Sequence, residues 1–541
     1  MKKILLFLFL IYKISCFSQD EDAWVYFKDK PNAITFLSNP LSMLTQRSLD
    51  RRVLQNIPLD IKDVPIYQPY INQITAIIGI TVKAKSKWLN CLHIRGTQTI
   101  IKTLSVLPFV DHLDFANSLL NSKINTIPKQ LNPINKNLTI ATTFNYGTSA
   151  NQIQMLNGHL LHQQNFTGQG KVIAVLDAGF PGVNTAQPFQ RLFSNNLILG
   201  GYDFVNKSSN FYTGNSHGTL VLSCMGGFKD GKLVGTAPDA GYYLFITEDV
   251  ASENPVEESN WVEAAEEADR LGVDIITSSL GYFDYDNPAY SHTYSDLTGN
   301  KTFVSRGVNI AFSRGIICVA SAGNSGSSSE PHIGVPAEAT NVLAIGAVKF
   351  DRTYATFSSI GPSFDGRIKP DVMAQGQATV LSNTAGIITT ASGTSFSGPI
   401  MAGMIASFWQ AVPTLTNQQV VNLVKQSADN YLTPNEQYGY GIPDFQKAIN
   451  LNSSQTAIVA LNNLQDFVFY QTPNSDFVSF AFPKGIEKAT VYFYDILGKF
   501  LSEKRITPAN NFIPVSEWNA GIYVYKIDTG ARIQSGKFLK K

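Results

Sequence analysis

The chain has 541 residues, the length of roughly three or four average domains. Lys and Arg number 42 against 41 Asp and Glu, so the net charge is +1, which excludes a whole-chain electrostatic attraction to nucleic acid or to an anionic membrane. Hydrophobic residues make up 44%, enough for a sizeable core and too many for a wholly disordered chain.

The N-terminus has the order of a secretion signal. Two lysines precede the apolar run Ile4–Ile11, and small residues follow up to Ser18. The run is far shorter than the ~20 residues of a membrane span. A lipid anchor on Cys16 is disfavoured, because Lys13 stands where such a site needs an aliphatic residue. We therefore expect a signal peptide over residues 1–18, and no membrane span in the exported chain.

Residues 19–130 have the pattern of a small α/β domain. The predicted elements are strands at Ala23–Phe27 and Ile74–Val82 and a helix at Leu41–Leu54. The helix carries three arginines on its polar faces: Arg47, Arg51 and Arg52. The stretch 121–137 is rich in Asn, Lys and Pro without a period, which indicates a linker.

Between residues 140 and 450, short apolar strands alternate with helical patterns. The clearest strands are Val172–Leu176, Val273–Ile276, Ile316–Ala320 and Val342–Ala347. This alternation predicts a doubly wound, mostly parallel sheet with helices on both faces. One helix presents an apolar face from Trp261 to Leu271, and Gly272 is predicted to end it.

Residues 461–541 change to a period of two, as in Val491–Tyr494 and Ile522–Tyr525, which predicts a small all-β sandwich. The four cysteines are too few for a disulfide scaffold and form no zinc-type pair: they are Cys16, Cys91, Cys224 and Cys318. Cys224 and Cys318 could pair, although two buried free thiols are favoured. His159 and His162 could share a metal ion, although a partly exposed helix face is favoured.

Two side chains suited to catalysis, a carboxylate and an imidazole, stand at the end of a predicted strand and at the start of a predicted helix. Asp177 ends the first apolar run, so it is expected at the carboxyl end of a buried parallel strand, the edge where open α/β sheets place their sites. His217 stands beside Gly218 at a predicted helix start and can present its ring to a cleft. The alternative for Asp177 alone is a cap on the following loop.

An asparagine and a serine complete the set. Asn324 follows the strand at 316–320 among small residues, where its side-chain amide can donate to a developing oxyanion. The alternative is an ordinary Asn-Gly turn. Ser395 is predicted at a helix N-terminus, where free backbone N–H groups and the helix dipole favour an anion. The alternative is a plain Ser N-cap.

The order of these motifs resembles that of the subtilisin-like serine peptidases (subtilases), whose catalytic order is Asp, His, Ser. The segments Gly235–Ala240 and Ser279–Gly281 are also similar to the family, and the resemblance covers roughly residues 140–450. The sequence departs from the family at Ala178, where Thr or Ser is usual, at Phe396–Ile400, and at Tyr282, where a small residue is common.

The resemblance implies a serine endopeptidase that hydrolyses peptide bonds in proteins or peptides. Ser395 would be the nucleophile, His217 the general base and Asp177 its orienting partner, with Asn324 binding the oxyanion. The implied substrate-binding residues are Ser279, Leu280, Gly281, Ser321, Ala322 and Gly323. No cofactor is required for this chemistry. Calcium is frequent in the family, but no Asp-rich run assigns a site here.

The flanking regions resemble accessory domains of such enzymes. Residues 19–130 are similar to a subtilase propeptide, which acts as a folding aid and intramolecular inhibitor. Residues 461–541 resemble the sorting domains of type IX secretion cargo, which implies contact with the secretion machinery and a secreted or cell-surface location. The alternative for this last module is a plain adhesion or substrate-binding sandwich.

Two other functions are weighed against the endopeptidase. One is a catalytically silent surface binding protein on a subtilase scaffold, which the four site residues argue against. The other is an α/β-hydrolase esterase, which is disfavoured because no G-x-S-x-G motif surrounds Ser395 and the order of motifs is wrong for that fold.

Overall fold

A computed structural model describes residues 20–121, 144–462, 466–471, 477–483, 485–508 and 510–540. The expected signal peptide and nearly all of the expected linker lie outside these residues. The chain divides into two compact units, residues 1–449 and 450–541. Within the described residues, no helix combines the length and the apolar character that crossing a bilayer requires.

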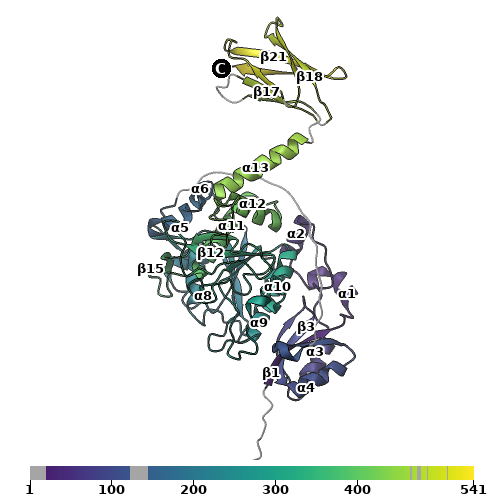
Figure 1. Cartoon of the computed structure of the whole chain (residues 1–541), viewed down its shortest axis with the longest axis vertical. Coiled ribbons are helices and arrows are strands. Elements are labelled where there is room, and N and C mark those ends of the chain that lie inside the picture. Colours follow the sequence, from purple (N-terminus) through teal and green to yellow (C-terminus); the bar gives the residue numbers. More distant parts are fainter. Residues whose placement is uncertain are drawn as a thin grey trace, which may run out of the picture. The chain divides into compact units, whose positions relative to one another are not determined.

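A seven-stranded parallel sheet forms the centre of the first unit (Figure 1). Its strands are β5 (Val172–Asp177), β6 (Ile198–Asp203), β9 (Gly241–Ile246), β10 (Ile275–Ser278), β11 (Ile317–Ser321), β12 (Val342–Val348) and β13 (Val372–Gln375). They lie in the order β13-β12-β11-β10-β5-β9-β6, so the direction of winding reverses between β5 and β10. The predicted doubly wound fold is confirmed.

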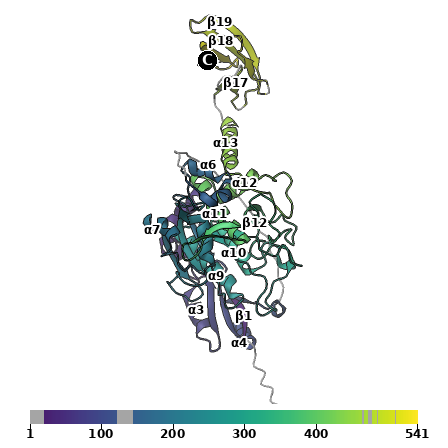
Figure 2. The same ribbon diagram turned by 90° about the vertical axis from the view of Figure 1, so that its left-hand side faces the viewer.

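Helices cover both faces of this sheet (Figures 1 and 2). Helices α8 (His217–Gly226) and α11 (Thr394–Ala411) pack on one face, and α9 (Val256–Leu271) and α10 (Phe303–Ser313) on the other. Gly272 ends α9 in the left-handed conformation at φ 80°, as predicted. The central strands are buried on both sides, which explains their continuous apolar runs.

Further helices and strands lie around this sheet, and the last helix, α13 (Phe445–Asn462), continues into the second unit. The others are α5 (Ala150–Gln154), α6 (Gly158–Gln163), α7 (Gln190–Ser194), β7 (Phe228–Lys229), β8 (Leu233–Val234), β14 (Thr379–Ser382), β15 (Ile388–Ala391) and α12 (Asn417–Ser427). The prediction of a partly exposed helix face is wrong for His162, which is fully buried; its two ring nitrogens bond Tyr146 Oη at 2.9 Å and the Thr236 carbonyl at 3.1 Å, which offsets the cost of burying them. Cys224 and Cys318 are buried free thiols, the favoured alternative.

Residues 20–121 form the N-terminal domain of the same unit. Its antiparallel sheet has the order β2-β3-β1-β4, from β1 (Asp20–Phe27), β2 (Thr81–Ser86), β3 (Cys91–Thr97) and β4 (Val110–Phe115). Its helices are α1 (Ala33–Leu37), α2 (Gln46–Leu54), α3 (Gln68–Thr75) and α4 (Gln98–Thr103).

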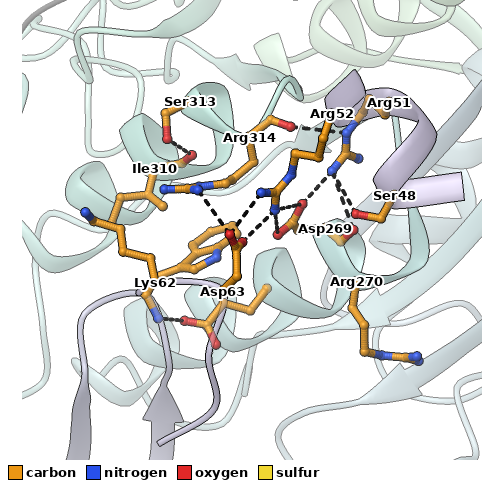
Figure 3. Close-up of polar contacts among 12 residues, drawn as sticks. Ser48, Arg51, Arg52, Lys62, Asp63, Asp269, Arg270, Ile310, Ser313 and Arg314 are labelled. Atoms are coloured by element: carbon orange, nitrogen blue, oxygen red, sulfur yellow. Dashed lines mark hydrogen bonds and ion pairs between the residues drawn. The ribbon is translucent and has the colours of Figure 1, made fainter. Parts of the chain in front are cut away.

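Three predictions for this domain need correction. The strand at 74–82 is wrong in its first part, because Ile74 is a buried residue of α3 and β2 begins only at Thr81. The helix at 41–54 begins at Gln46, after the Thr45 N-cap. Arg51 and Arg52, predicted on polar faces, are 5% and 2% exposed, because α2 packs against a second domain, where both arginines pair with Asp269 of α9 (Figure 3).

Beyond the end of α13, the second unit is all-β, as predicted. One sheet contains β16 (Val468–Gln471), β17 (Phe477–Ala481) and β20 (Phe512–Pro514), and the other contains β18 (Ala489–Asp495), β19 (Phe500–Ile506), β21 (Gly521–Asp528) and β22 (Ile533–Lys540). Inward residues of both sheets, such as Phe480, Phe493 and Tyr525, enclose one apolar core. Burial alternates along β18 and β21 with the predicted period of two.

Glu338 makes stability depend on pH. Its side chain is buried, Oε1 accepts a hydrogen bond from Ser305 Oγ at 2.6 Å, and among the described residues Oε2 has no partner. Burial raises the pKa of Glu338 to about 7. This folded pKa lies above the unfolded value. The contribution of Glu338 to the free energy of unfolding is therefore fully present below about pH 4.5. It is lost as the pH rises toward 7, by up to about 1.4 kcal/mol per pH unit.

We therefore expect Glu338→Gln to flatten this dependence. Urea unfolding at pH 5 and pH 8 measures it, and the free energy of unfolding should fall less between these values in the variant than in the parent chain. Glu330→Gln, at an exposed carboxylate, is the matched control and should leave the dependence unchanged. Equal slopes in the parent chain and Glu338→Gln would contradict the assignment.

Candidate active site

Asp177 and His217 meet at the point where the sheet reverses its winding. Asp177 is the last residue of β5 and is fully buried, and His217 is the first residue of α8. The His217 ring donates from Nδ1 to Asp177 Oδ1 at 2.7 Å. Gly218 permits this approach, because a Cβ there would lie 2.9 Å from the Asp177 Cβ. The predicted carboxylate and imidazole are thus hydrogen-bonded.

The surroundings of this pair adjust its charge. Attraction by Asp177 holds the pKa of His217 above its usual range, against the opposite effect of burial. Asp177 Oδ1 also accepts from the Ala178 N–H at 2.8 Å, while Oδ2 has no hydrogen-bond partner among the described residues. Ala178 has no hydroxyl that could donate to this carboxylate, whereas the Thr or Ser that is usual at this position in the family has one.

Glu248, which the sequence analysis did not single out, is a second acid near the pair. It follows β9, the neighbour of β5, and its Oε1 accepts from the Tyr282 hydroxyl at 2.6 Å. Burial and the charge of Asp177 raise the pKa of Glu248 to about 8. Tyr282 is itself buried, and it is not among the residues that line the cavity beside Ser395. The only sequence signal was an acidic residue just beyond an apolar strand.

The N-terminus of α11 carries Ser395 as its second residue. Pro399 lies in the same helix and has no N–H to bond the Ser395 carbonyl, four residues before it. The Ser279 hydroxyl donates to that carbonyl instead, at 2.9 Å. Ser321 Oγ donates to the next carbonyl back, that of Thr394, at 2.7 Å. Side chains at the ends of β10 and β11 therefore fix the start of the helix.

Asn324 is oriented by the same helix end. Its Oδ1 accepts from the backbone N–H of Thr394 at 2.9 Å and from the Thr394 hydroxyl at 3.0 Å, which leaves the side-chain N–H groups as donors. A Cβ on Gly393 would lie 3.7 Å from both Asn324 Nδ2 and the Ser395 backbone nitrogen. Two donors thus flank one point beside Ser395.

A cavity of about 610 Å³ opens beside these groups. Its lining includes Asn324, Ser395 and all six residues expected to bind substrate: Ser279, Leu280, Gly281, Ser321, Ala322 and Gly323. It also includes residues that the sequence analysis did not propose: Tyr294, Glu330, His332, Gly334, Ser359 and Thr394. Thr394 is the first residue of α11, and the others come from segments between the strands, where nothing local in the sequence shows that they meet.

His217 is not among the residues that line the cavity, and its ring centroid lies 6.1 Å from that of Phe396, the residue after Ser395. Among the contacts of the described residues, no hydrogen bond joins His217 to the Ser395 hydroxyl. Catalytic hydrogen bonds of this kind are often long until substrate binds. In the described part of the chain, no group of three or more His, Cys, Asp or Glu side chains is arranged to hold a metal ion.

The fold and this site define an α/β enzyme with its cleft at the carboxyl edge of a parallel sheet. Residues 168–441 match the model of the subtilase family, and the chain belongs to that family. Residues 22–132 match the S8 peptidase propeptide domain of Bacteroidota, and residues 468–541 match a secretion system C-terminal sorting domain.

Two subtilisins agree with the family models. The chain is 30% identical to subtilisin DY of Bacillus licheniformis over 310 residues, which are 57% of this chain and 99% of the relative. It is 31% identical to subtilisin NAT of Bacillus subtilis subsp. natto over 55% of this chain and 70% of the relative. The crystal structure of MycP1 from the ESX-1 type VII secretion system matches with 21% identity and a TM-score of 0.44, covering 59% of this chain and 91% of that chain. The chain is a subtilisin-family serine protease with a type IX secretion sorting domain.

Proposed function

We propose that the chain is a secreted serine endopeptidase in which Ser395 attacks the carbonyl of an extended protein substrate. The observation that carries this proposal is the 2.7 Å hydrogen bond between Asp177 and His217 at the switch point of the sheet, beside the helix whose second residue is Ser395. His217 takes the proton from Ser395 and later protonates the leaving amine. Asp177 holds the ring in place and stabilises the imidazolium.

The oxyanion would be bound by the Asn324 side-chain N–H and the Ser395 backbone N–H. The geometry around Gly393 supports this role, because both nitrogens lie 3.7 Å from the point that a Cβ on Gly393 would occupy. The substrate would pair as a strand with Ser279–Gly281. All the groups in these steps belong to side chains or backbone, so the chemistry needs no cofactor.

The flanking regions set where and when the enzyme acts. Residues 1–18 would direct export, residues 19–130 would assist folding and inhibit until the chain is cut between 120 and 140, residues 140–450 would catalyse, and residues 461–541 would address the protein to the secretion machinery. The expected location is outside the cell or on its surface.

A fluorophosphonate probe tests the proposal against the silent binding protein. We expect the purified chain to be labelled at Ser395 and to digest a peptide library. Ser313→Ala, at an exposed serine of α10, is the control and should be labelled fully. Labelling that persists in Ser395→Ala, or its absence from a folded parent chain, would contradict the proposal.

Two variants of Asn324 separate its two roles, as a donor to the oxyanion and as an acceptor that anchors the start of α11. We expect Asn324→Ala to lower kcat about 10²–10³-fold with little change in KM, because an oxyanion donor acts mainly in the transition state. Asn324→Asp keeps an acceptor for the two Thr394 donors but loses the amide donor. Steady-state kinetics on a peptide substrate should therefore show no recovery in Asn324→Asp. Recovery there would mean that anchoring the helix, and not the oxyanion, explains the loss.

A further inference from the structure

The proposed mechanism gives no role to Tyr282, one of the positions at which the sequence departs from the family. Tyr282 directly follows Ser279–Gly281, the segment expected to pair with substrate, and it is 1% exposed. Its hydroxyl donates to Glu248 Oε1 at 2.6 Å. Its backbone N–H donates to the Val335 carbonyl at 2.8 Å. Tyr282 is therefore bonded on two sides, through its side chain and through its backbone.

The segment Ser279–Gly281 is fixed at its two ends and open between them. At one end the Ser279 hydroxyl donates to the Ser395 carbonyl at 2.9 Å. At the other end the two bonds of Tyr282 hold the chain. Within the described part of the chain, the backbone groups of the two residues between these anchors make no hydrogen bond. Free N–H and C=O groups of this kind are what an incoming strand needs, so the segment is an edge open to pairing.

Glu248 is held in place by the strand that carries Asp177. Thr247, the residue before Glu248, donates its backbone N–H to the Asp177 carbonyl at 3.0 Å, which extends the pairing of β9 with β5. The Thr247 hydroxyl donates to Glu248 Oε1 at 3.3 Å. The Glu248 carboxylate is thus tied to the end of β5, and the Tyr282 hydroxyl connects it to the segment that follows β10.

The charges that act on Glu248 make the Tyr282 hydroxyl important to both partners. Burial, and after it the charges of Asp177 and Glu253, raise the pKa of Glu248 to about 8, while the hydrogen bond from Tyr282 acts in the opposite direction. The hydroxyl is therefore the main group that favours the ionised carboxylate. A buried phenol in turn needs an acceptor. Loss of either partner leaves the other short of a hydrogen bond.

We propose that Glu248 and Tyr282 are positioning residues, which hold Ser279–Gly281 in line as the strand with which an extended substrate pairs. The inference rests on the proposed function in taking this segment to bind substrate. Neither side chain is among the residues that line the cavity beside Ser395, so both act through the backbone of the segment and not by touching substrate. Their effect should therefore be large for a substrate that pairs with the whole segment and absent for one that does not reach it.

Two substrates measure this difference. One is a peptide from the library digest of the parent chain, long enough to span the segment at about 3.3 Å per residue. The other is p-nitrophenyl acetate, whose small acyl group does not extend along the segment. We expect Tyr282→Phe to lower kcat/KM about 10–100-fold for the peptide and to leave that for the ester within about twofold, since the lost bond is to a charged group. Equal losses on both substrates, or no loss on the peptide, would overturn the proposal.

Variants of Glu248 test whether the hydrogen bond carries the effect. Glu248→Gln keeps an acceptor for the Tyr282 hydroxyl and should retain most of the peptide turnover, whereas Glu248→Ala should resemble Tyr282→Phe. Combining Glu248→Ala with Tyr282→Phe should add no further loss, because both changes remove one bond. Additive losses in the double variant would overturn the pairing of the two residues.

Tyr285→Phe is the matched control for Tyr282→Phe. Tyr285 is also buried, and its hydroxyl donates to another buried carboxylate, Glu258 Oε1, at 2.8 Å. Its removal should leave the ratio of peptide to ester turnover unchanged. If the ratio fell as far in Tyr285→Phe as in Tyr282→Phe, the effect would belong to any buried tyrosine of this region and the proposal would be wrong.

Hydrogen exchange tests the positioning without any turnover. In full-length Ser395→Ala, we expect the amide of Tyr282, which bonds the Val335 carbonyl, to exchange about tenfold faster when Glu248→Ala is added, and to be unaffected by Tyr285→Phe. Mass spectrometry follows the exchange, and equal rates with and without Glu248→Ala would overturn the proposal. If the rates differ as expected but the parent chain cleaves neither a library peptide nor the ester, the proposed function fails and the positioning of the segment stands.

Discussion

Ser395→Ala is expected to lower kcat/KM for peptide hydrolysis by about 10⁴–10⁶, the range that loss of a triad member gives in serine proteases. The hydroxyl is the atom that would form the acyl bond, and its loss leaves only the oxyanion donors to assist water. Little structural change should accompany the loss, because the hydroxyl is part-exposed and the helix start is fixed by Ser279 and Ser321 through backbone carbonyls.

The measurement is steady-state kinetics together with thermal unfolding of the same preparations. Ser279→Ala is the informative companion, because it removes the hydroxyl that bonds the Ser395 carbonyl and leaves the nucleophile present. We expect a smaller loss of kcat there, with a lower midpoint of unfolding. Undiminished turnover in Ser395→Ala would remove this residue from the mechanism.

The fold of the catalytic domain was predictable because its signals are local. The strands β5, β10, β11 and β12 are short runs buried on both sides, and Gly272 is placed by its own conformational freedom at the end of α9. Chain order then fixes a parallel sheet, since helices separate the strands. The candidate site residues were predicted by the same logic, because Asp177 ends β5 and Asn324 follows β11.

The domain interface was not predictable, because its signal is divided between distant segments. Arg51 and Arg52 look like surface residues when α2 is considered alone. On α9, Trp261 and its neighbours mark one buried face, but Glu266 and Asp269 lie on the other face, which the N-terminal domain covers. Charge pairs such as Arg52 with Asp269 span 217 positions, and periodicity within one helix carries no information about them.

The finer geometry of the site was also beyond the sequence. The need for a donor to the Ser395 carbonyl follows from Pro399, which is visible, but its supply by Ser279 depends on the packing of α11 against β10. Glu248 gives a similar lesson. Its position beyond β9 is visible, yet its effect on charge arises only because β9 lies beside β5, which brings it close to Asp177.

Asp177→Asn is expected to lower kcat about 10⁴-fold near neutral pH. An amide at this position donates to Nδ1 of His217, which moves the ring proton to Nε2, the atom that must accept the serine proton. Attraction by Asp177 is also the largest cause of the raised pKa of His217, so the variant's pKa should fall. Because the base acts when neutral, the parent chain loses activity as pH drops through the raised pKa, and in the variant this loss should begin at lower pH.

Asp203→Asn is the matched control, since Asp203 is the last residue of β6, is equally buried and caps its own turn through the N–H groups of Val205 and Asn206. It should lower stability and leave the titration of His217 unchanged. The profile of kcat/KM from pH 5 to pH 10, with an NMR titration of the His217 ring, separates the two variants. If Asp203→Asn moved the acidic limb as far as Asp177→Asn, the effect would belong to any buried carboxylate of the sheet, and Asp177 would lose its role as the partner that sets the charge of the base.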